Sequence, residues 1–507
     1  MANLYFRNIA VNWGTAANWS TTADGNTPSA AIPTAADNVF FTNLSGNCNT
    51  AANSVCASID CTGYINTLTF VGNTTVSGNI KFVPAMTVAG TAMLTINAAA
   101  IITSAGKAFT GGLTFNAAVT YTLADNLTVN GNFVSSGTGV RTVNGFNLSI
   151  GGNLTINASV QGTTNFTITG NCTWIGGQAL NNNLTINCGA NTLTCTTTVN
   201  VGGDFTYQSG TLNVATSTIT FNGTNQSLTF GNSATWGNIT FLTNTATYTL
   251  LSNLRLSGIF TSSGGAANFK TINGFTIYAG GGLNISGSTQ GTTNIILSGA
   301  GTYSGSGVLA ANLTIDAGAG TIAIPAIVYQ TIGTFKYISG TVTGGPIQFG
   351  GQQTLDFAPL NFAGTINLSN ANTYTLASKL MCDNLAVTSL GGQPILAGTG
   401  GFEVGTLTIN IDGLILNPGN TYIVNNALTG NLSNPVTHGI MKSVTAGTIV
   451  SLTLKSGAAC NVGYVDFIDI DASAGTQINS FNGQIINCKN VVGYIDPVQS
   501  IAKSFAA

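Results

Sequence analysis

The stretch GGLTFNAAVTYTLADNLTVNGNFVSSG, residues 111–137, decides the fold of this chain. Within it, Leu-Thr-Phe, Tyr-Thr-Leu and Leu-Thr-Val alternate apolar and short polar side chains with the period of two that is typical of a half-buried strand. Asn-Gly and similar residues lie between such triplets, where the chain must turn with positive φ. The stretch therefore predicts short strands with apolar residues pointing inward, Thr or Asn pointing outward, and tight turns between them.

This pattern recurs at two lengths. TYTL occurs three times, with its tyrosine at Tyr121, Tyr248 and Tyr374, spaced by 127 and 126 residues. Within one long unit, NLTV, NLSI, NFTI and NLTI begin at residues 126, 147, 165 and 183, a beat of 18 to 21 residues that matches one coil of a solenoid. We expect an all-β, elongated β-solenoid (β-helix) with stacked coils of about 18–21 residues. Tandem β-sandwich domains are the alternative, although their strands usually recur roughly every 8 to 12 residues.

The longer repeat also sets the expected domain limits. TVNGFNLSIGGNLTINASVQGTTNFTI (142–168) matches TINGFTIYAGGGLNISGSTQGTTNIIL (271–297). A solenoid has open strand edges at both ends, so the unrepeated terminal segments are what capping requires. The expected domains are a Trp-containing N-terminal cap or docking segment (1–65), three solenoid repeat units (66–200, 201–326 and 327–430), and a C-terminal β cap and tail (431–507).

Charge is scarce in this chain. Its 507 residues include only 12 Lys and Arg and 14 Asp and Glu, so Thr, Asn, Ser and Gly must fill the surface. Scattered cations and a net charge of −2 provide no basic stripe for nucleic acid. No apolar run approaches the roughly 18 residues of a membrane span, and the opening MANLYFRNIAVNWG lacks the regions of a signal peptide. We expect no nucleic-acid partner, no membrane span, and synthesis in a cytoplasm.

The nine cysteines are irregularly spaced and include no C-x-x-C pair. We interpret them as small buried hydrophobic residues. The exception to consider is one local disulfide among Cys48, Cys56 and Cys61, which lie close together in the sequence.

The N-terminal segment carries two of the four tryptophans, in VNWGTAANWS, followed by IPTAADNVFF. Such aromatic residues can close the first coil of a solenoid, or they can anchor a partner as hot-spot residues do. Both readings stay open at this point. The candidate cap or docking residues are Trp13, Trp19, Pro33, Asp37 and Phe40.

The equal spacing of Tyr121, Tyr248 and Tyr374 suggests two roles. The three rings could form a ladder that contacts a glycan, or they could be buried at equivalent coil corners. A glycan ladder requires exposed rings, and a corner role requires buried ones.

The search for a reactive site gives few candidates. Asp466, Asp469 and Asp471 form the one cluster of carboxylates, a weak calcium candidate because the D-x-D-x-D-G pattern is missing, and a solvated strand face is the alternative. The sole histidine, His438, has no nucleophile or carboxylate at a spacing that supports a triad. Glu403 is the single glutamate, so paired carboxylates for glycoside cleavage are scarce. We predict a non-enzymatic protein without cofactor or metal.

The opening VNWGTAANWS, the segment PTAADNVFF, the Thr/Asn/Gly-rich coils and the closing Y-x-D-F-x-D and A-x-A-G elements resemble the β-helical virion proteins of tailed bacteriophages. The residues that carry the resemblance are Trp13, Asn18, Trp19, Pro33, Asp37, Phe40, Tyr464, Asp466 and Gly475.

The resemblance implies a tail fibre, a head fibre or a capsid decoration on the surface of a virion assembled in the host cytoplasm. Other virion proteins are then the expected partners, a host-surface glycan is a candidate ligand, and a homotrimer is a candidate assembly. Two alternatives remain: a tailspike-like polysaccharide depolymerase and a bacterial cell-surface adhesin.

Overall fold

The computed structural model describes residues 2–265, 269–326, 328–357, 362–388, 392–409, 412–430 and 438–494. The chain is 56% strand and forms a β-solenoid of about 21 turns, which confirms the expected fold class. The one helix within the described ranges is the short 3-10 turn η1 (Ala16–Asn18). The chain divides into two compact units, Met1–Thr243 with Tyr248–Leu254, and Asn244–Thr247 with Arg255–Ala507, and each is described by itself. The expectation of a tail at residues 495–507 lies outside the described residues.

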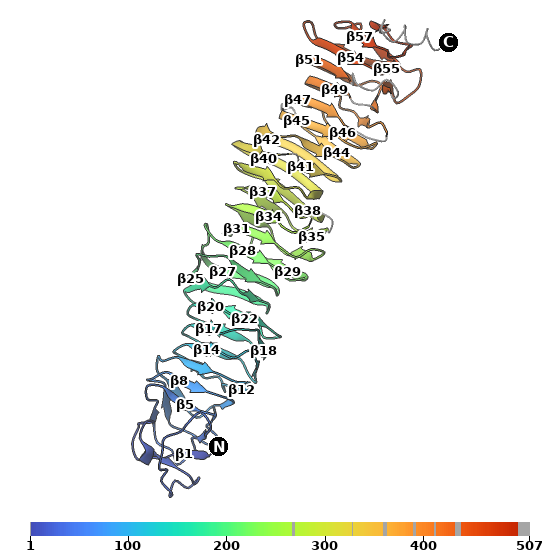
Figure 1. Ribbon diagram of the computed structural model, residues 1–507. Helices are drawn as coiled ribbons and strands as arrows, with labels where there is room; N and C mark the ends of the chain where they lie inside the picture. The colour runs from blue at the N-terminus through green and yellow to red at the C-terminus, as the bar shows by residue number, and fades with distance from the viewer. Residues whose placement is uncertain are drawn as a thin grey trace, which may run out of the picture. The chain divides into compact units, whose positions relative to one another are not determined.

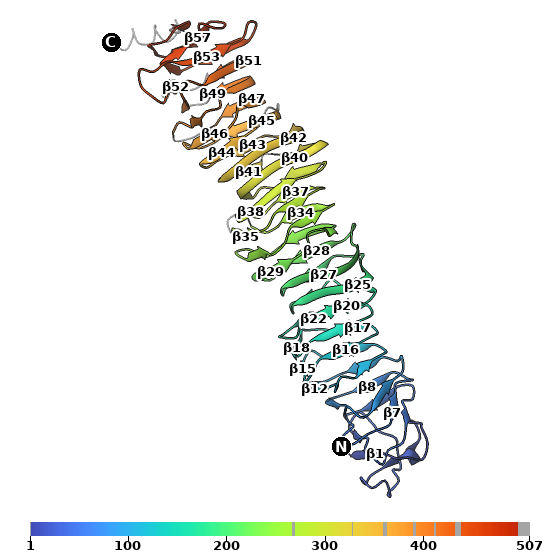
Figure 2. The same cartoon turned by 180° about the vertical axis from the view of Figure 1, so that it is seen from behind.

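Up to residue 180, the coils of the first unit contribute short strands to three faces, and the strands of a face stack in parallel in chain order (Figures 1 and 2). The first face contains β5 (Ser54–Cys56), β8 (Thr74–Val76), β11 (Leu94–Ile96), β14 (Leu113–Phe115), β17 (Phe133–Ser135), β20 (Leu154–Ile156) and β23 (Cys172–Ile175). The second contains β3 (Asn38–Phe40), β6 (Ser58–Asp60), β9 (Ile80–Lys81), β12 (Ala100–Thr103), β15 (Thr120–Leu123), β18 (Arg141–Gly145) and β21 (Val160–Gln161). The third contains β13 (Ala108–Phe109), β16 (Leu127–Val129), β19 (Leu148–Ile150) and β22 (Phe166–Ile168). Beyond them, β25 (Leu184–Cys195) and β27 (Phe205–Asn213) are longer, and β25 pairs with strands of both the first and the third face.

The register between coils follows the sequence beat. Leu94 pairs with Thr74 of the preceding coil and with Leu113 of the following one, and Leu113 pairs with Phe133. Because the pairing is parallel, each inward residue lies directly over the inward residue of the next coil. Sandwich domains are built from antiparallel strands, so the tandem-sandwich alternative is wrong.

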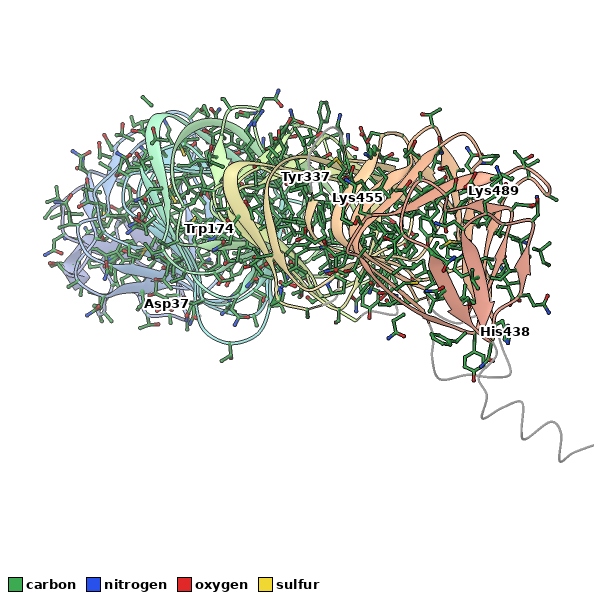
Figure 3. The ribbon with its side chains drawn as sticks, turned by 90° about the horizontal axis from the view of Figure 1, so that it is seen from above. Asp37, Trp174, Tyr337, His438, Lys455 and Lys489 are labelled. Atoms are coloured by element: carbon green, nitrogen blue, oxygen red, sulfur yellow. The ribbon has the colours of Figure 1, made fainter. Side chains whose placement is uncertain are left out.

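Aromatic rings fill the core between these faces. Phe115 stacks on Tyr121 with ring centroids 4.0 Å apart, and Phe133 lies edge-on to both Phe115 and Phe166 at 5.3 and 5.5 Å. Trp174 is also fully buried inside its coil (Figure 3). Buried rings of this size contribute much of the apolar area that a narrow solenoid can remove from water.

The N-terminal cap begins the second face. β1 (Asn3–Phe6) pairs in parallel with β3 and antiparallel with β2 (Trp19–Ser20), the one antiparallel strand pairing among the described strand registers. This reversal folds the chain back over the first coil, where it covers the open end of the core.

The second unit repeats this parallel stacking with longer strands that bend from one face to the next. The bent strands are β38 (Thr289–Leu297), β40 (Val308–Ile324), β42 (Gly333–Gly344), β45 (Phe362–Leu368), β47 (Leu380–Val387), β49 (Phe402–Ile409) and β51 (Thr421–Gly430). Shorter strands precede, separate and follow them, among them β35 (Lys270–Gly274), β44 (Gln353–Asp356), β46 (Thr373–Leu376), β52 (Gly439–Ser443), β55 (Val465–Ile468) and β56 (Ile470–Asp471). The limits inferred from the repeat at residues 65, 200, 326 and 430 stay an interpretation of the sequence.

Candidate functional site

Trp13 and Trp19 form the centre of the cap rather than its surface. Both side chains are fully buried, their rings meet edge-on at 4.9 Å, and the Trp19 indole nitrogen donates a hydrogen bond to the carbonyl of Trp13 at 2.8 Å. Phe6 and Phe41 pack against Trp19 in the same cluster. Neither ring is accessible, so the two tryptophans cannot serve as exposed docking anchors in this structure, and their burial is what the capping interpretation requires.

The other three cap candidates also support the cap. Asp37 accepts hydrogen bonds from the backbone nitrogen of Ala2 at 2.8 Å and from the hydroxyl of Thr34 at 2.6 Å, and these bonds lower its carboxyl pKa (Figure 3). Pro33 is buried. Phe40 is half-buried and stacks on Tyr5 at 4.9 Å. Asp37 thus fixes the start of the chain beside the turn that precedes β3.

The three repeated tyrosines are buried corner residues. Tyr121, Tyr248 and Tyr374 have no exposed surface, and their hydroxyls donate to backbone carbonyls of an earlier coil at 3.2, 3.1 and 2.8 Å. Burial raises the pKa of all three, that of Tyr374 to about 12. A glycan ladder is therefore wrong for these residues, because a ring enclosed on all sides has no face to offer a sugar.

The C-terminal carboxylates serve separate local bonds. Asp469 is buried at a corner with φ of 59° and accepts from the backbone nitrogen of Gly447 at 2.8 Å and the amide of Asn487 at 2.6 Å. Asp471 lies in β56 beyond that corner, with Lys489 3.4 Å away. The alternative of one solvated strand face is wrong for this cluster, because Asp469 is buried and the corner separates it from Asp471. In the part of the chain that the structure describes, no three His, Cys, Asp or Glu side chains converge as metal ligands, so the calcium candidate has no geometric support.

Asp466 has a partner that sequence spacing did not reveal. Its carboxylate lies 2.9 Å from Nδ1 of His438, and it also accepts from the backbone nitrogen of Gln484 at 2.6 Å. The two residues meet because β52 and β55 pair in parallel, with Gly439 opposite Val465. Figure 3 shows His438 where strands of the second unit end. The two residues are 28 residues apart, which does not match the beat of 18 to 21 residues, so the spacing gave no signal for this contact.

The cysteines are all free thiols. Seven are buried, which confirms their interpretation as small hydrophobic residues, and Cys460 and Cys488 are half-buried. Burial raises the thiol pKa, to about 12 at Cys172 and Cys195. The local disulfide considered for Cys48, Cys56 and Cys61 does not form. Thiols held protonated in this way are poor nucleophiles.

Two buried cations occupy equivalent corners of the repeat, and the sequence analysis did not single them out. Arg141 and Lys270 are both fully buried, and burial lowers the pKa of each. Arg141 donates to the carbonyls of Asn116 and Gly139 at 2.8 and 2.7 Å, and also to that of Ser136. Lys270 donates to the carbonyl of Ser263. These cations donate hydrogen bonds to backbone oxygens inside the coil. They thereby stabilise the neighbouring turns, and neither of them places a charge on the outer surface of its corner.

Helices long and apolar enough to cross a membrane are absent from the described ranges. Comparison with known proteins gave no matching family model, curated protein or solved structure.

Proposed function

We propose that this chain is a non-enzymatic structural protein of a bacteriophage virion, a fibre or a decoration of the capsid or tail. Its N-terminal cap attaches to other virion proteins, and its coils carry a surface that contacts the host. The observation that carries the proposal is the cap, which has a closed aromatic core and exposed aliphatic side chains among the polar residues of its surface, at the start of a parallel stack of coils.

The apolar surface of the cap supports attachment. Ile9 and Leu44 are 58% and 54% exposed and line one surface pocket together. Val11 of the cap and Val71, which follows the cap in the sequence, are 49% and 63% exposed and line a second pocket together. Exposed apolar side chains gathered in this way are typical of interaction sites. The docking role that the sequence assigned to buried tryptophans is therefore better placed on these four aliphatic residues.

The stacking of the coils supports the projecting role. Each coil pairs with its neighbours through parallel backbone hydrogen bonds and a continuous core, so the solenoid can be lengthened by duplication without a new core design. The three repeated tyrosines, Tyr121, Tyr248 and Tyr374, join neighbouring coils, because each hydroxyl donates to a backbone carbonyl of an earlier coil. The resemblance to β-helical virion proteins supports the surface of a virion as the location of such a scaffold.

The test is to image particles from cells that produce this chain, with an antibody against it. Labelled particles are expected, and purified particles that carry no copies would reject the proposal. Label confined to the surface of cells that lack particles would favour the adhesin alternative. A fall in viscosity when the purified chain is added to host polysaccharide would favour the depolymerase alternative.

A matched pair of variants tests the cap. Ile9→Asp combined with Leu44→Asp places two charges on the apolar surface and should remove the chain from particles without unfolding it. Ile332→Asp changes a residue of similar exposure, 51%, in the second unit and should leave incorporation unchanged.

Sedimentation of the purified chain tests the proposed homotrimer, for which a mass three times that of one chain is expected.

A further inference from the structure

Two short stretches at one corner of the solenoid are duplicated in an unusual way: their exposed residues are identical in the two copies, whereas most of their buried residues differ. The exposed residues directly before the corner, Val140 and Phe269, are not alike. The first copy comprises residues 141–146 and 160–166 of the first unit, and the second comprises residues 270–275 and 289–295 of the second unit. The identical outward pairs are Thr142 and Thr271, Asn144 and Asn273, Phe146 and Phe275, Gln161 and Gln290, Thr163 and Thr292, and Asn165 and Asn294. The buried pairs that differ are Arg141 and Lys270, Val143 and Ile272, Val160 and Thr289, and Phe166 and Ile295, while Thr164 and Thr293 are alike.

The outward side chains have the same geometry in the two copies. In the first, the Gln161 amide donates to the Thr142 hydroxyl at 3.4 Å, and the backbone nitrogen of Thr163 donates to the Asn144 side-chain oxygen at 3.1 Å. In the second, the corresponding distances from Gln290 to Thr271 and from Thr292 to Asn273 are both 3.2 Å. Each copy therefore presents the same small array of amides and hydroxyls.

Part of this identity has a structural reason. Gly145 has φ of 101° and donates its backbone nitrogen to the Thr163 hydroxyl at 3.2 Å, so the glycine, Asn144 and Thr163 build the turn. Gly274 and Thr292 make the same contact at 3.3 Å.

The phenylalanines have no such reason. Phe146 and Phe275 follow these turns and are 54% and 51% exposed. A ring that keeps half of its surface in water contributes less to folding than a fully buried one, and surface positions are usually freer to change than core positions. Their retention beside a retained polar array indicates a ligand.

We infer that the two corners are equivalent binding sites for a neutral polysaccharide. Phe146 and Phe275 offer the electron-rich face of a ring to the C–H face of a sugar, and Gln161 and Gln290 offer amide groups to its hydroxyls. The six outward side chains of each copy are uncharged, and the nearby cation, Arg141 or Lys270, is turned into the core. A charged ligand would find no counter-charge among these side chains, whereas a neutral, hydroxyl-rich chain matches them.

This inference rests on the proposed contact with the host surface and names its chemistry. Each unit carries its own copy of the array, so each corner is expected to bind by itself. A single-site variant should therefore lose part of the binding, and a double variant should lose nearly all of it.

The experiment measures the retardation of the purified full chain in native gels that contain dextran, mannan, or soluble chitin oligosaccharides coupled to a carrier. Retardation by at least one of these neutral polymers is expected. Phe146→Ala combined with Phe275→Ala should weaken it by about tenfold or more, because each variant removes a stacking face. Phe146→Trp combined with Phe275→Trp keeps the aromatic face and should preserve binding.

The matched control is Ile332→Ala, which truncates a side chain of similar exposure outside the corners and should bind as the unaltered chain does. Equal binding by the double alanine variant would overturn the assignment, and so would retardation by anionic polymers alone or by none of the probes. These outcomes leave the virion proposal standing, because labelling of particles tests it separately. Particles without the chain, together with loss of retardation in the double variant, would reject the virion role and retain the binding site.

Discussion

The Arg141 corner of the first unit and the Lys270 corner of the second arise from the same repeated stretch, yet the backbone carbonyls that accept hydrogen bonds from the two buried cations differ. Both cations donate to the carbonyl of the second serine of a Ser-Ser-Gly turn, Ser136 in one copy and Ser263 in the other. The Arg141 guanidinium also reaches Asn116, whereas Lys270 presents one compact ammonium group close to its turn.

The difference shows which positions the solenoid allows to vary. A buried position tolerates exchange when the new side chain fills the space and finds acceptors, as Arg and Lys or Val and Ile do here. The six outward pairs of these stretches have a weaker packing requirement, yet they did not change, whereas the flanking exposed residues Val140 and Phe269 differ. If stability alone decided which residues are kept, the buried residues would be identical and the outward ones would differ. The two corners show the reverse, so their outward residues are kept for a reason other than packing.

The largest expected effect concerns a buried ring that packs against the first corner through Phe166. Phe133→Ala removes a fully buried side chain that contacts Phe115 and Phe166, and it should lower the local unfolding free energy by about 3–5 kcal/mol. Native-state hydrogen exchange of β14, β17 and β20 would measure it. A loss below about 1 kcal/mol would mean that the core is not closely packed there.

A smaller loss is expected when the two cations are made alike. Arg141→Lys leaves carbonyls such as those of Asn116 and Gly139 without their donor, and it should cost about 1–3 kcal/mol in the first unit. Hydrogen exchange of β15, β18 and β21 would report the change. Unaltered protection would show that a lysine can replace the guanidinium in either corner, and the comparison would lose its physical basis.

Removing one hydroxyl should cost less again. Tyr121→Phe keeps the ring that stacks on Phe115 but loses the hydrogen bonds of the hydroxyl to Ile96 and Ala117, so a loss of about 1 kcal/mol is expected. Thermal unfolding of the variant beside Tyr374→Phe would compare the first and third copies. Equal stability of variant and parent would contradict the role of these hydroxyls at coil corners.

The two cations should also differ in their response to pH. Burial lowers the pKa of Lys270, so the folded chain releases this proton more readily than the unfolded chain, whose lysine titrates near 10.5. Stability around Lys270 should therefore rise with pH between the lowered pKa and about 10.5 and then level off, because the unfolded state binds more protons in that window. Limited proteolysis between pH 7 and 11 would measure it, and Lys270→Met should abolish the trend. Arg141 stays charged throughout this range and should show none.

The smallest expected effect concerns the exposed phenylalanines. Phe146→Ala and Phe275→Ala should change stability by less than about 0.5 kcal/mol, because each ring is half exposed. Thermal unfolding would measure the change. A loss as large as that of Phe133→Ala would show that these rings are retained for packing, and the contrast between the inner and outer faces of the corner would disappear.

The sequence by itself determined the fold class, the coil length and the direction of most side chains. An alternation such as Leu-Thr-Phe can bury only one face of a strand, and a beat of 18 to 21 residues fits one coil, so local spacing was sufficient. It also indicated that the chain begins with a distinct aromatic segment, because Trp13 and Trp19 stand outside the repeat.

Only the tertiary structure decided which side chains are accessible and which ones meet. An equal spacing of tyrosines suits an outer ladder and a buried corner alike, and burial of Tyr121, Tyr248 and Tyr374 decided between them. His438 reaches Asp466 because two coils pair in parallel, a contact that depends on register and on the path of the intervening chain. The physical reason is the same in each case: strand periodicity is local, whereas burial and pairing depend on how one coil lies on the next.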